Sequence, residues 1–223
     1  MRRYSSSTYS LEGFLKLLSK VQEAVARIAY PPGESLADIK HVAAVDVAYR
    51  DETYFSAAVI YDCIRENLAE KAYETGVAEF PYIPSYLLLR EVLPMMAAVQ
   101  RLGSGWDLLL VDGHGRAHPR MCGLATFLGF MLGRPTLGVA KKLLVGERRE
   151  YLQGLDEIIY RGERVGFAVG GPGGKTFYVS QGYGVGYGDL IKILNIFKMR
   201  YPEPLKIAHA ETVRLRRGLV QKG

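Results

Sequence analysis

Apolar residues near the N-terminus recur at the spacing of a helix. Ser10 comes just before them and is a suitable helix N-cap, whereas Pro31-Pro32-Gly33 stops the pattern. The pattern predicts a helix that faces the core. Its apolar positions are Leu11, Phe14, Leu15, Leu18, Val21, Val25 and Ile28.

Three β-like runs follow, at residues 42–49, 54–63 and 68–78. Short polar turns, Arg50-Asp51-Glu52 and Arg65-Glu66-Asn67, separate them. Runs rich in β-branched and aromatic residues with turns this short pair with their neighbours in sequence. We therefore expect an antiparallel meander.

The middle of the chain alternates helical and strand patterns. After Pro81-Tyr82-Ile83-Pro84, the order predicted is a helix over about 86–102 that Pro94 breaks or kinks, a strand over 107–112, a helix near 121–132 and a strand over 135–140. The core order β-β-β-α-β-α-β predicts an α/β protein with a mixed sheet flanked by helices. A hairpin near 170–175, a helix near 188–199 and a polar C-terminal tail complete one domain over 1–223, with its core at about 10–210.

The strand at 107–112 ends in a carboxylate, Asp112, before the glycine turn of Gly113 and Gly115. If the first strand lies centrally and the fourth runs parallel beside it, Asp46 becomes a neighbour of Asp112. Glu91, in the helix after the proline-rich turn, would lean over the same edge. Carboxylates this close raise one another's pKa or bind a divalent cation, and oxygen ligands select Mg²⁺ or Mn²⁺ over zinc.

Each acid also has a structural explanation. Asp112 could cap the next turn, and Asp46 could sit at the rim of the sheet. Glu91 could pair with Arg90 or Lys71 as a solvated surface residue. The three acids become a site only if the fold brings them together.

Composition narrows the class of protein. Of 223 residues, 29 are Lys or Arg and 23 are Asp or Glu, and the resulting pI near 9.2 favours a polyanionic partner. Cys63 and Cys122 have no metal-ligand spacing, which suits a reducing cytoplasm. No apolar run reaches the length of about 18 residues that spans a membrane, and the start lacks the apolar core of a secretory signal. We expect a cytoplasmic protein without a membrane partner.

The sequence resembles the endonuclease V family, repair nucleases that act on deaminated bases. Four ordered blocks carry the resemblance: Val45-Asp46-Val47-Ala48-Tyr49; Pro81-Tyr82-Ile83-Pro84 with Arg90-Glu91; Val111-Asp112-Gly113 to Ala117-His118-Pro119, continuing into Gly138-Val139-Ala140-Lys141; and Tyr178-Val179-Ser180 with Pro202-Glu203-Pro204. They span most of residues 40–210 and imply a ribonuclease-H-like fold.

The resemblance also implies a reaction and its residues. The family's acids correspond to Asp46, Glu91 and Asp112, which would hold Mg²⁺, with Mn²⁺ expected to substitute. A metal-positioned water would then hydrolyse a phosphodiester on the 3′ side of the lesion. Lys141 would stabilise phosphate charge, although it could also be a solvated lysine. His118 would orient a ligand or contact DNA, its alternative being a turn histidine, and His209 would serve the metal or a proton transfer unless it is an exposed tail residue.

Lesion recognition is implied at a second place. Pro81, Tyr82, Ile83 and Pro84, with Ser85 and Arg90 following, resemble the family's strand-separating wedge, in which two prolines hold an aromatic ring in one direction. An ordinary turn that packs its tyrosine is the alternative. Gly113, Gly115 and Gly123 would let backbone amides approach a flipped hypoxanthine. Ser85-Tyr86 stands where relatives often have Gly-Leu, and His114 where several carry an amide, which leaves the lesion range open.

Two further stretches are weaker signals. The run from Gly170 to Thr176 is not a P-loop, because three residues rather than four separate Gly170 from Gly174, and a strand follows it. It predicts a hairpin turn with Lys175 available to DNA. The basic stretch Arg214-Leu215-Arg216-Arg217, with Lys222, is either a phosphate contact or a solvated tail.

The sequence therefore predicts a monomeric, metal-dependent endonuclease with damaged DNA as its partner and deoxyinosine as its chief lesion. Inosine-containing RNA remains open, because 2′-hydroxyl discrimination leaves no readable mark. Two other hypotheses are a non-catalytic nucleic-acid-binding relative and a structure-specific ribonuclease or resolvase of the same fold. The three acids argue against the first, and the wedge with its glycine pocket argues against the second.

Overall fold

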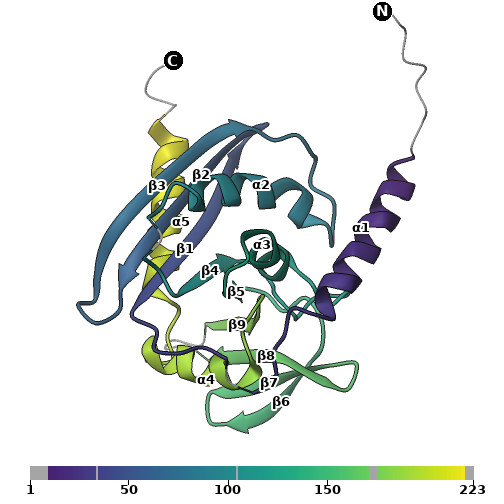
Figure 1. Cartoon of the computed structure of the whole chain (residues 1–223), viewed down its shortest axis with the longest axis vertical. Coiled ribbons are helices and arrows are strands. Elements are labelled where there is room, and N and C mark those ends of the chain that lie inside the picture. The colour runs from purple at the N-terminus through teal and green to yellow at the C-terminus, as the bar shows by residue number, and fades with distance from the viewer. Residues whose placement is uncertain (1–9, 34, 104, 171–174, 219–223) are drawn as a thin grey trace, which may run out of the picture.

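The first three strands form the predicted meander. A computed structural model describes residues 10–33, 35–103, 105–170 and 175–218. Strands β1 (His41–Arg50), β2 (Thr53–Asp62) and β3 (Asn67–Val77) pair antiparallel in sequence order, as expected from their short polar turns. The meander forms one side of the sheet (Figure 1).

Two parallel strands extend this sheet beyond β1. Strand β4 (Leu108–Asp112) pairs parallel with β1, and β5 (Thr136–Ala140) pairs parallel with β4. The connections between them contain α2 (Leu87–Val99), which includes Pro94, and α3 (Leu124–Leu132). The four apolar residues of β4 are fully buried, which is the environment expected for a parallel strand covered on both faces. The predicted β-β-β-α-β-α-β core and mixed sheet are therefore confirmed.

The second half of the sheet was only partly predicted. Strands β6 (Glu147–Leu152), β7 (Leu155–Tyr160), β8 (Glu163–Gly170) and β9 (Thr176–Gln181) follow one another antiparallel. Among the described residues, the strand order of the sheet is β3-β2-β1-β4-β5-β9-β8-β7-β6. The hairpin expected near 170–175 is the β8–β9 connection, and its residues 171–174 lie outside the described part of the chain. Every residue of β6 is exposed, so that strand carries no alternating apolar signal.

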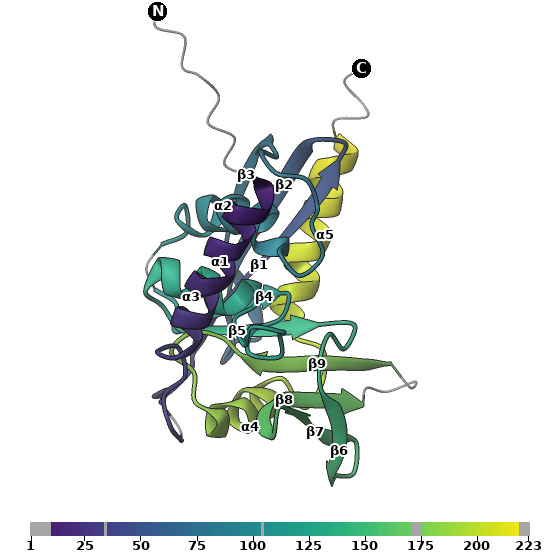
Figure 2. The same ribbon diagram turned by 90° about the vertical axis from the view of Figure 1, so that its right-hand side faces the viewer.

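Helices cover the sheet on both faces. Helices α2, α3 and α1 (Leu11–Ala26) lie on one face, and α5 (Glu203–Gly218) lies on the other, with α4 (Tyr187–Ile196) below it against β8 and β9 (Figures 1 and 2). Each face has its own hydrophobic core. The site described below lies at the sheet edge between these two layers.

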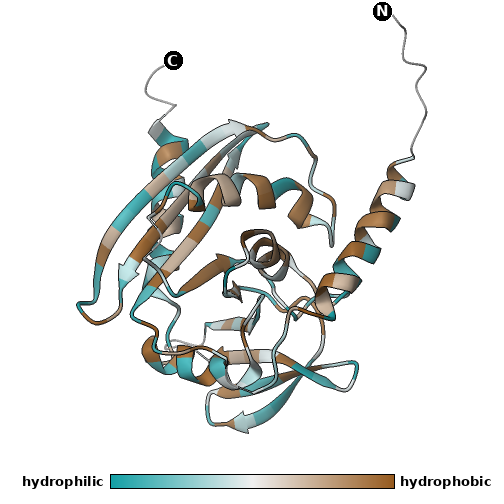
Figure 3. Ribbon diagram, viewed as in Figure 1, coloured by the Kyte–Doolittle hydropathy of each residue, from teal (hydrophilic) through white to brown (hydrophobic). Residues whose placement is uncertain are grey.

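Two expectations about the helices need correction. Ser10 caps α1 by accepting a hydrogen bond from the Gly13 amide (3.1 Å), as predicted. The helix is not wholly core-facing, however, because only Leu18, Gln22 and Val25 are buried, and brown apolar positions remain on its outer side (Figure 3). The apolar face of α1 is wider than its contact with α3, so part of that face stays exposed.

The second correction concerns the end of the chain. The expected polar tail is the sixteen-residue helix α5. It packs on β1 and β2 through a short row of small and apolar residues, Leu205, Ala208 and Thr212. Arg214 pairs with Glu211 (2.7 Å) on this helix, while Lys222 lies outside the described residues. In the described part of the chain, no helix combines the length and apolarity that a membrane crossing would require.

Candidate active site

The register of two parallel strands brings Asp46 and Asp112 together. Val45 of β1 is the partner of Val111 in β4, so the residues that follow them lie side by side at the carboxyl edge of the strands. Strand β4 ends at Asp112, and its carboxylate is partly exposed, whereas Asp46 is buried. The sheet therefore joins two acids that are 66 positions apart in the sequence.

Helix α5 completes the group from the opposite side. His209 Nδ1 hydrogen-bonds with Asp46 Oδ2 (2.9 Å), and Thr212 Oγ1 donates to the same oxygen (3.1 Å). Their spacing of three residues places both side chains on one face of the helix. Ligand atoms of Asp46, Asp112 and His209 all lie within 4.8 Å of one another, so these residues could hold a metal ion.

Glu91 lies close to this group without belonging to it. Burial on α2, followed by the charges of Asp46 and Asp112, raises the pKa of Glu91 to about 8. Burial and then Asp112 also raise the pKa of Asp46, while the hydrogen bonds from His209 and Thr212 lower it. The three predicted acids therefore affect one another's pKa. The ligand atoms that lie close enough to share one metal ion, however, belong to Asp46, Asp112 and His209.

Lys141 and Tyr201 form the outer wall of the site. Lys141 follows β5 and donates from Nζ to Asp112 Oδ2 (3.0 Å), and it lies 5.8 Å from the centre of the Tyr201 ring. Burial, then Asp112 and Asp46, raises the pKa of the Tyr201 phenol. Lys141 thus offers a positive charge beside the acids, where a phosphate would carry negative charge.

The donor set fits a hard divalent cation. Two carboxylates at short distance repel each other, and a cation bound between them would remove that repulsion. Carboxylate oxygens are the ligands that Mg²⁺ and Mn²⁺ prefer, and one imidazole is compatible with Mn²⁺. Direct ligation through His209 Nδ1 would replace its hydrogen bond with Asp46.

The loop of residues 81–85, which the resemblance assigns as the wedge and which we call the wedge loop, is held by two partly buried contacts. Ser85 adopts a left-handed backbone (φ 64°), and its carbonyl accepts a hydrogen bond from Arg120 and lies 3.2 Å from His118 Nε2. Burial, then the charge of Arg120, lowers the pKa of His118 to about 3, so its ring is neutral. His118 thus contacts the wedge loop in this structure. The Tyr82 side of the loop faces solvent, with Tyr82 64% exposed.

Arg90 also braces the loop. Its Nη1 donates to the carbonyl of Phe80 (2.9 Å), and its guanidinium lies 4.3 Å from the centre of the Tyr49 ring. Tyr49 in turn donates to the Arg90 carbonyl (2.9 Å). The segment of Pro81, Tyr82, Ile83, Pro84 and Ser85 is therefore anchored at both ends by cationic side chains.

The glycines beside Asp112 are required by backbone packing. A Cβ on Gly123 would lie 2.3 Å from the carbonyl oxygen of His114, and one on Gly115 would lie 2.0 Å from that of Gln181. The amides of Gly113, Gly115 and Gly123 already donate to Val139 O, Ser180 Oγ and Gly115 O. They would read a base edge only by giving up these bonds. Burial lowers the pKa of the adjacent His114, which favours its neutral form.

Sequence reasoning missed Thr212, Tyr201 and Arg120. Thr212 could have been found, because Leu205, Ala208 and Thr212 recur at helical spacing around His209. Tyr201 and Arg120 reach their partners, Lys141 and the Ser85 carbonyl, only through the tertiary fold. Nothing local in the sequence marks either residue.

Replacing His209 by alanine is expected to weaken binding of a divalent cation at this group by about 10- to 100-fold, because Asp46 loses a partner that orients it. A titration of the protein with Mn²⁺, followed by calorimetry, measures the loss. His41→Ala, on a histidine next to Asp62 at the other end of β1, is the matched control, and equal losses in both variants would contradict the assignment.

Comparison with known proteins agrees with this geometry. The family model for endonuclease V matches residues 22–210. A Thermofilum pendens endonuclease V is 36% identical over 212 residues, covering 93% of this chain and 91% of its own. The Bacillus subtilis endonuclease V structure superposes with a TM-score of 0.84 at 25% identity, covering 99% of this chain and 98% of its own.

A second solved structure contains nucleic acid. A Ciona intestinalis endonuclease V, in complex with a 24mer DNA containing an inosine followed by a ribo-adenosine, superposes with a TM-score of 0.81 at 25% identity. It covers 93% of this chain and 99% of its own. These likenesses confirm the expected ribonuclease-H-like fold. The chain belongs to the endonuclease V family.

Proposed function

We propose that this protein is a single-domain, metal-dependent DNA repair endonuclease. It recognises deaminated adenine, chiefly deoxyinosine, and hydrolyses the phosphodiester on the 3′ side of the lesion. The observation that carries the proposal is the group of Asp46, Asp112 and His209 at the sheet edge. Mg²⁺ is the proposed cofactor, and Mn²⁺ would substitute.

The side chains have separate roles in this proposal. Asp46 and Asp112 hold the cation, which when bound acidifies a water and neutralises charge on the phosphate. His209 and Thr212 orient Asp46 through its Oδ2 atom. Glu91, whose pKa is raised to about 8, holds a proton at neutral pH and could donate it beside the acids. Lys141 would leave Asp112 and stabilise the charge of the reacting phosphate.

Lesion recognition would use the wedge loop. An enzyme that inspects one base in a duplex must take that base out of the stack, which leaves a gap. Tyr82 is the exposed aromatic residue of a loop that Arg90, His118 and Arg120 anchor. The inosine-containing DNA bound by the Ciona intestinalis relative supports inosine as the lesion.

A cleavage assay tests the proposal directly. The substrate is an end-labelled duplex with one deoxyinosine, incubated with Mg²⁺ or with EDTA and resolved to one nucleotide on a denaturing gel. A metal-dependent nick on the 3′ side of the inosine, absent from the undamaged duplex, is the expected result. Binding without any cutting would instead favour a non-catalytic nucleic-acid-binding protein.

Inosine in RNA is a second candidate substrate. The observation that favours it is the ribo-adenosine that follows the inosine in the strand bound by the Ciona intestinalis protein. The same gel can compare a strand with deoxyinosine and deoxyadenosine, one with a single ribo-adenosine after the inosine, and one made of RNA. Faster cutting of the last two would identify a ribonuclease.

Replacing Tyr82 by alanine is expected to weaken binding to inosine-containing duplex by about 10-fold or more, since an aromatic stack on a base contributes roughly 1–3 kcal/mol. Binding of metal should stay unchanged, because no contact links Tyr82 to Asp46 or Asp112 among the described residues. Fluorescence anisotropy with inosine and undamaged duplexes measures the change. Tyr82→Phe keeps the ring and should keep the preference, and a loss equal to that of alanine would contradict the wedge.

A further inference from the structure

A cavity of about 880 Å³ adjoins the site on the α5 side of the sheet. We call it the cationic cavity, and its walls include Lys141, Lys175, Phe177, Arg200, Tyr201 and Lys206. His209 also borders it, so the cavity continues from the proposed metal group. Three segments far apart in sequence build it: the residue after β5, the start of β9, and the turn before α5 together with α5 itself.

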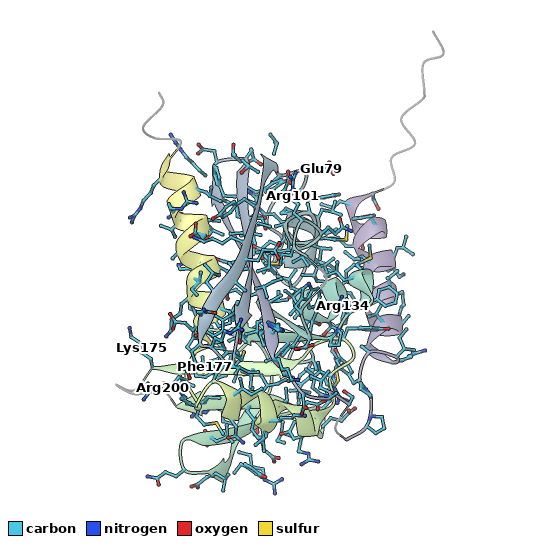
Figure 4. All side chains as sticks on the ribbon, turned by 60° about the vertical axis from the view of Figure 1, so that its left-hand side comes forward. Glu79, Arg101, Arg134, Lys175, Phe177 and Arg200 are labelled. Carbon is cyan, nitrogen blue, oxygen red and sulfur yellow. The ribbon has the colours of Figure 1, made fainter. Side chains whose placement is uncertain are left out.

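The cationic cavity contains more positive side chains than are paired with nearby acids. Lys141 forms an ion pair with Asp112 (3.0 Å), and Lys206 forms one with Glu203 (2.8 Å). Lys175 and Arg200 are exposed, and neither forms an ion pair with another described residue. Arg200 also borders an adjoining cavity that contains Glu66 and Glu203. Figure 4 shows Lys175, Phe177 and Arg200 close together below α5.

An aromatic wall accompanies these cations. Tyr201 packs edge-on against Phe177, with ring centres 5.6 Å apart and an interplanar angle of 78°. Phe177 is buried and fixes the Tyr201 ring, which is itself only partly buried. A positive groove with an aromatic ring is the pattern that binds single-stranded nucleic acid, because phosphates meet the cations and a base meets the ring.

The position of the cavity indicates which arm of a bound nucleic-acid strand would reach it. Helix α2, which follows the wedge loop, packs on one face of the sheet, and α5, which borders the cavity, packs on the other. Asp46 and Asp112 link the two sides, because their charges act on Glu91 of α2 while their side chains contact His209 and Lys141 at the cavity. A strand that enters at the wedge and passes the acids would continue into the cavity. Because the proposed cut lies on the 3′ side of the lesion, this continuation is the 3′ arm.

We infer that the cationic cavity binds the strand on the 3′ side of the cleavage position. One nucleotide lies against Tyr201, and its flanking phosphates lie beside Lys175 and Arg200. This inference rests on the proposed function for its direction. Lys175 and Arg200 are then positioning residues: by binding the 3′ arm, they hold the scissile phosphate in place.

The test compares Lys175→Ala/Arg200→Ala with Lys16→Ala/Arg149→Ala. All four side chains are exposed, so both variants remove two surface charges without opening the core. Labelled single strands with one inosine carry a long 3′ arm, a 3′ arm ending just after the cleavage position, or a shortened 5′ arm. Dissociation constants are measured in EDTA over a range of salt concentrations.

The native protein and the control should bind the long 3′ arm more tightly than the short one. The cavity variant should lose this advantage, by about tenfold, and the slope of log affinity against log salt should fall by about 1.4, or about 0.7 for each lost phosphate contact. An unchanged slope, or an equal loss on the short 3′ arm, would overturn the inference.

The proposed function is tested separately, by comparing the dissociation constants of the native protein for strands with inosine and with adenine. If that preference is missing while the cavity variant still loses salt dependence, the lesion assignment fails and the cavity stands as a strand-binding site. If the preference is present and the salt slope is unchanged, the cavity assignment fails alone.

Discussion

Replacing Asp46 by asparagine is expected to abolish strand cleavage in a protein that stays folded. Asparagine has the same shape but cannot supply a charged ligand, so the two-carboxylate arrangement with Asp112 is lost. We expect a rate loss of at least about a thousandfold, equivalent to about 4 kcal/mol of activation free energy. Asp112→Asn should have the same effect, because each acid supplies one side of the group.

Folding should survive both substitutions. Burial and the charge of Asp112 raise the pKa of Asp46, so an ionised Asp46 costs stability near neutral pH. An amide removes that charge, and its oxygen can still accept the hydrogen bond from Thr212. The thermal unfolding midpoint in EDTA should therefore stay the same or rise.

Single-turnover cleavage of the deoxyinosine duplex, with a matched thermal melt, measures both effects. Asp38→Asn changes an exposed aspartate away from the sheet edge and should leave the rate unchanged. Metal-dependent cutting at the native position by Asp46→Asn or Asp112→Asn would refute the metal group. Loss of cutting together with a lower melting midpoint would instead indicate a structural role.

The sequence predicted the first half of the sheet because its physical signals are local. The meander has short polar turns between β-rich runs, and β4 is a continuous apolar run with an acid at its end. Parallel pairing of β1 and β4 then makes Asp46 and Asp112 neighbours, whatever lies around them. Strand β6 was missed because all its side chains face solvent.

Apart from Thr212, which a helical pattern around His209 could have indicated, the rest of the site depends on tertiary contacts that no local pattern reports. Helix α5 has low apolar content, and its role is seen only where His209 and Thr212 meet Asp46. The resemblance assigned His118 to orienting a ligand or contacting DNA, and its neighbour in the fold is the Ser85 carbonyl. The glycines at 113, 115 and 123 were assigned to base recognition, while the structure shows backbone atoms at Gly115 and Gly123 that leave no space for a Cβ.

Raising the pH in EDTA is expected to destabilise the native protein, and Glu91 is expected to be a main cause. Its pKa of about 8 in the folded state lies above the ordinary value of 4.5. Between these two values the folded protein holds a proton on Glu91 that the unfolded chain has released, so the contribution of Glu91 to stability is fully present below 4.5 and is lost as the pH rises to about 8. The slope contributed by one such group is at most about 1.4 kcal/mol per pH unit.

Glu91→Gln should make this loss of stability shallower, because the amide does not ionise. Mg²⁺ should reduce it in the native protein, and more strongly at high pH, since a bound cation offsets the repulsion among Glu91, Asp46 and Asp112. Thermal melts across pH, with EDTA and with Mg²⁺, measure both effects. Glu150→Gln, on the exposed strand β6, should follow the native curve. A Glu91→Gln curve as steep as the native one would show that the pH-dependent cost arises elsewhere, because only an ionising Glu91 adds its own charge to the two aspartates.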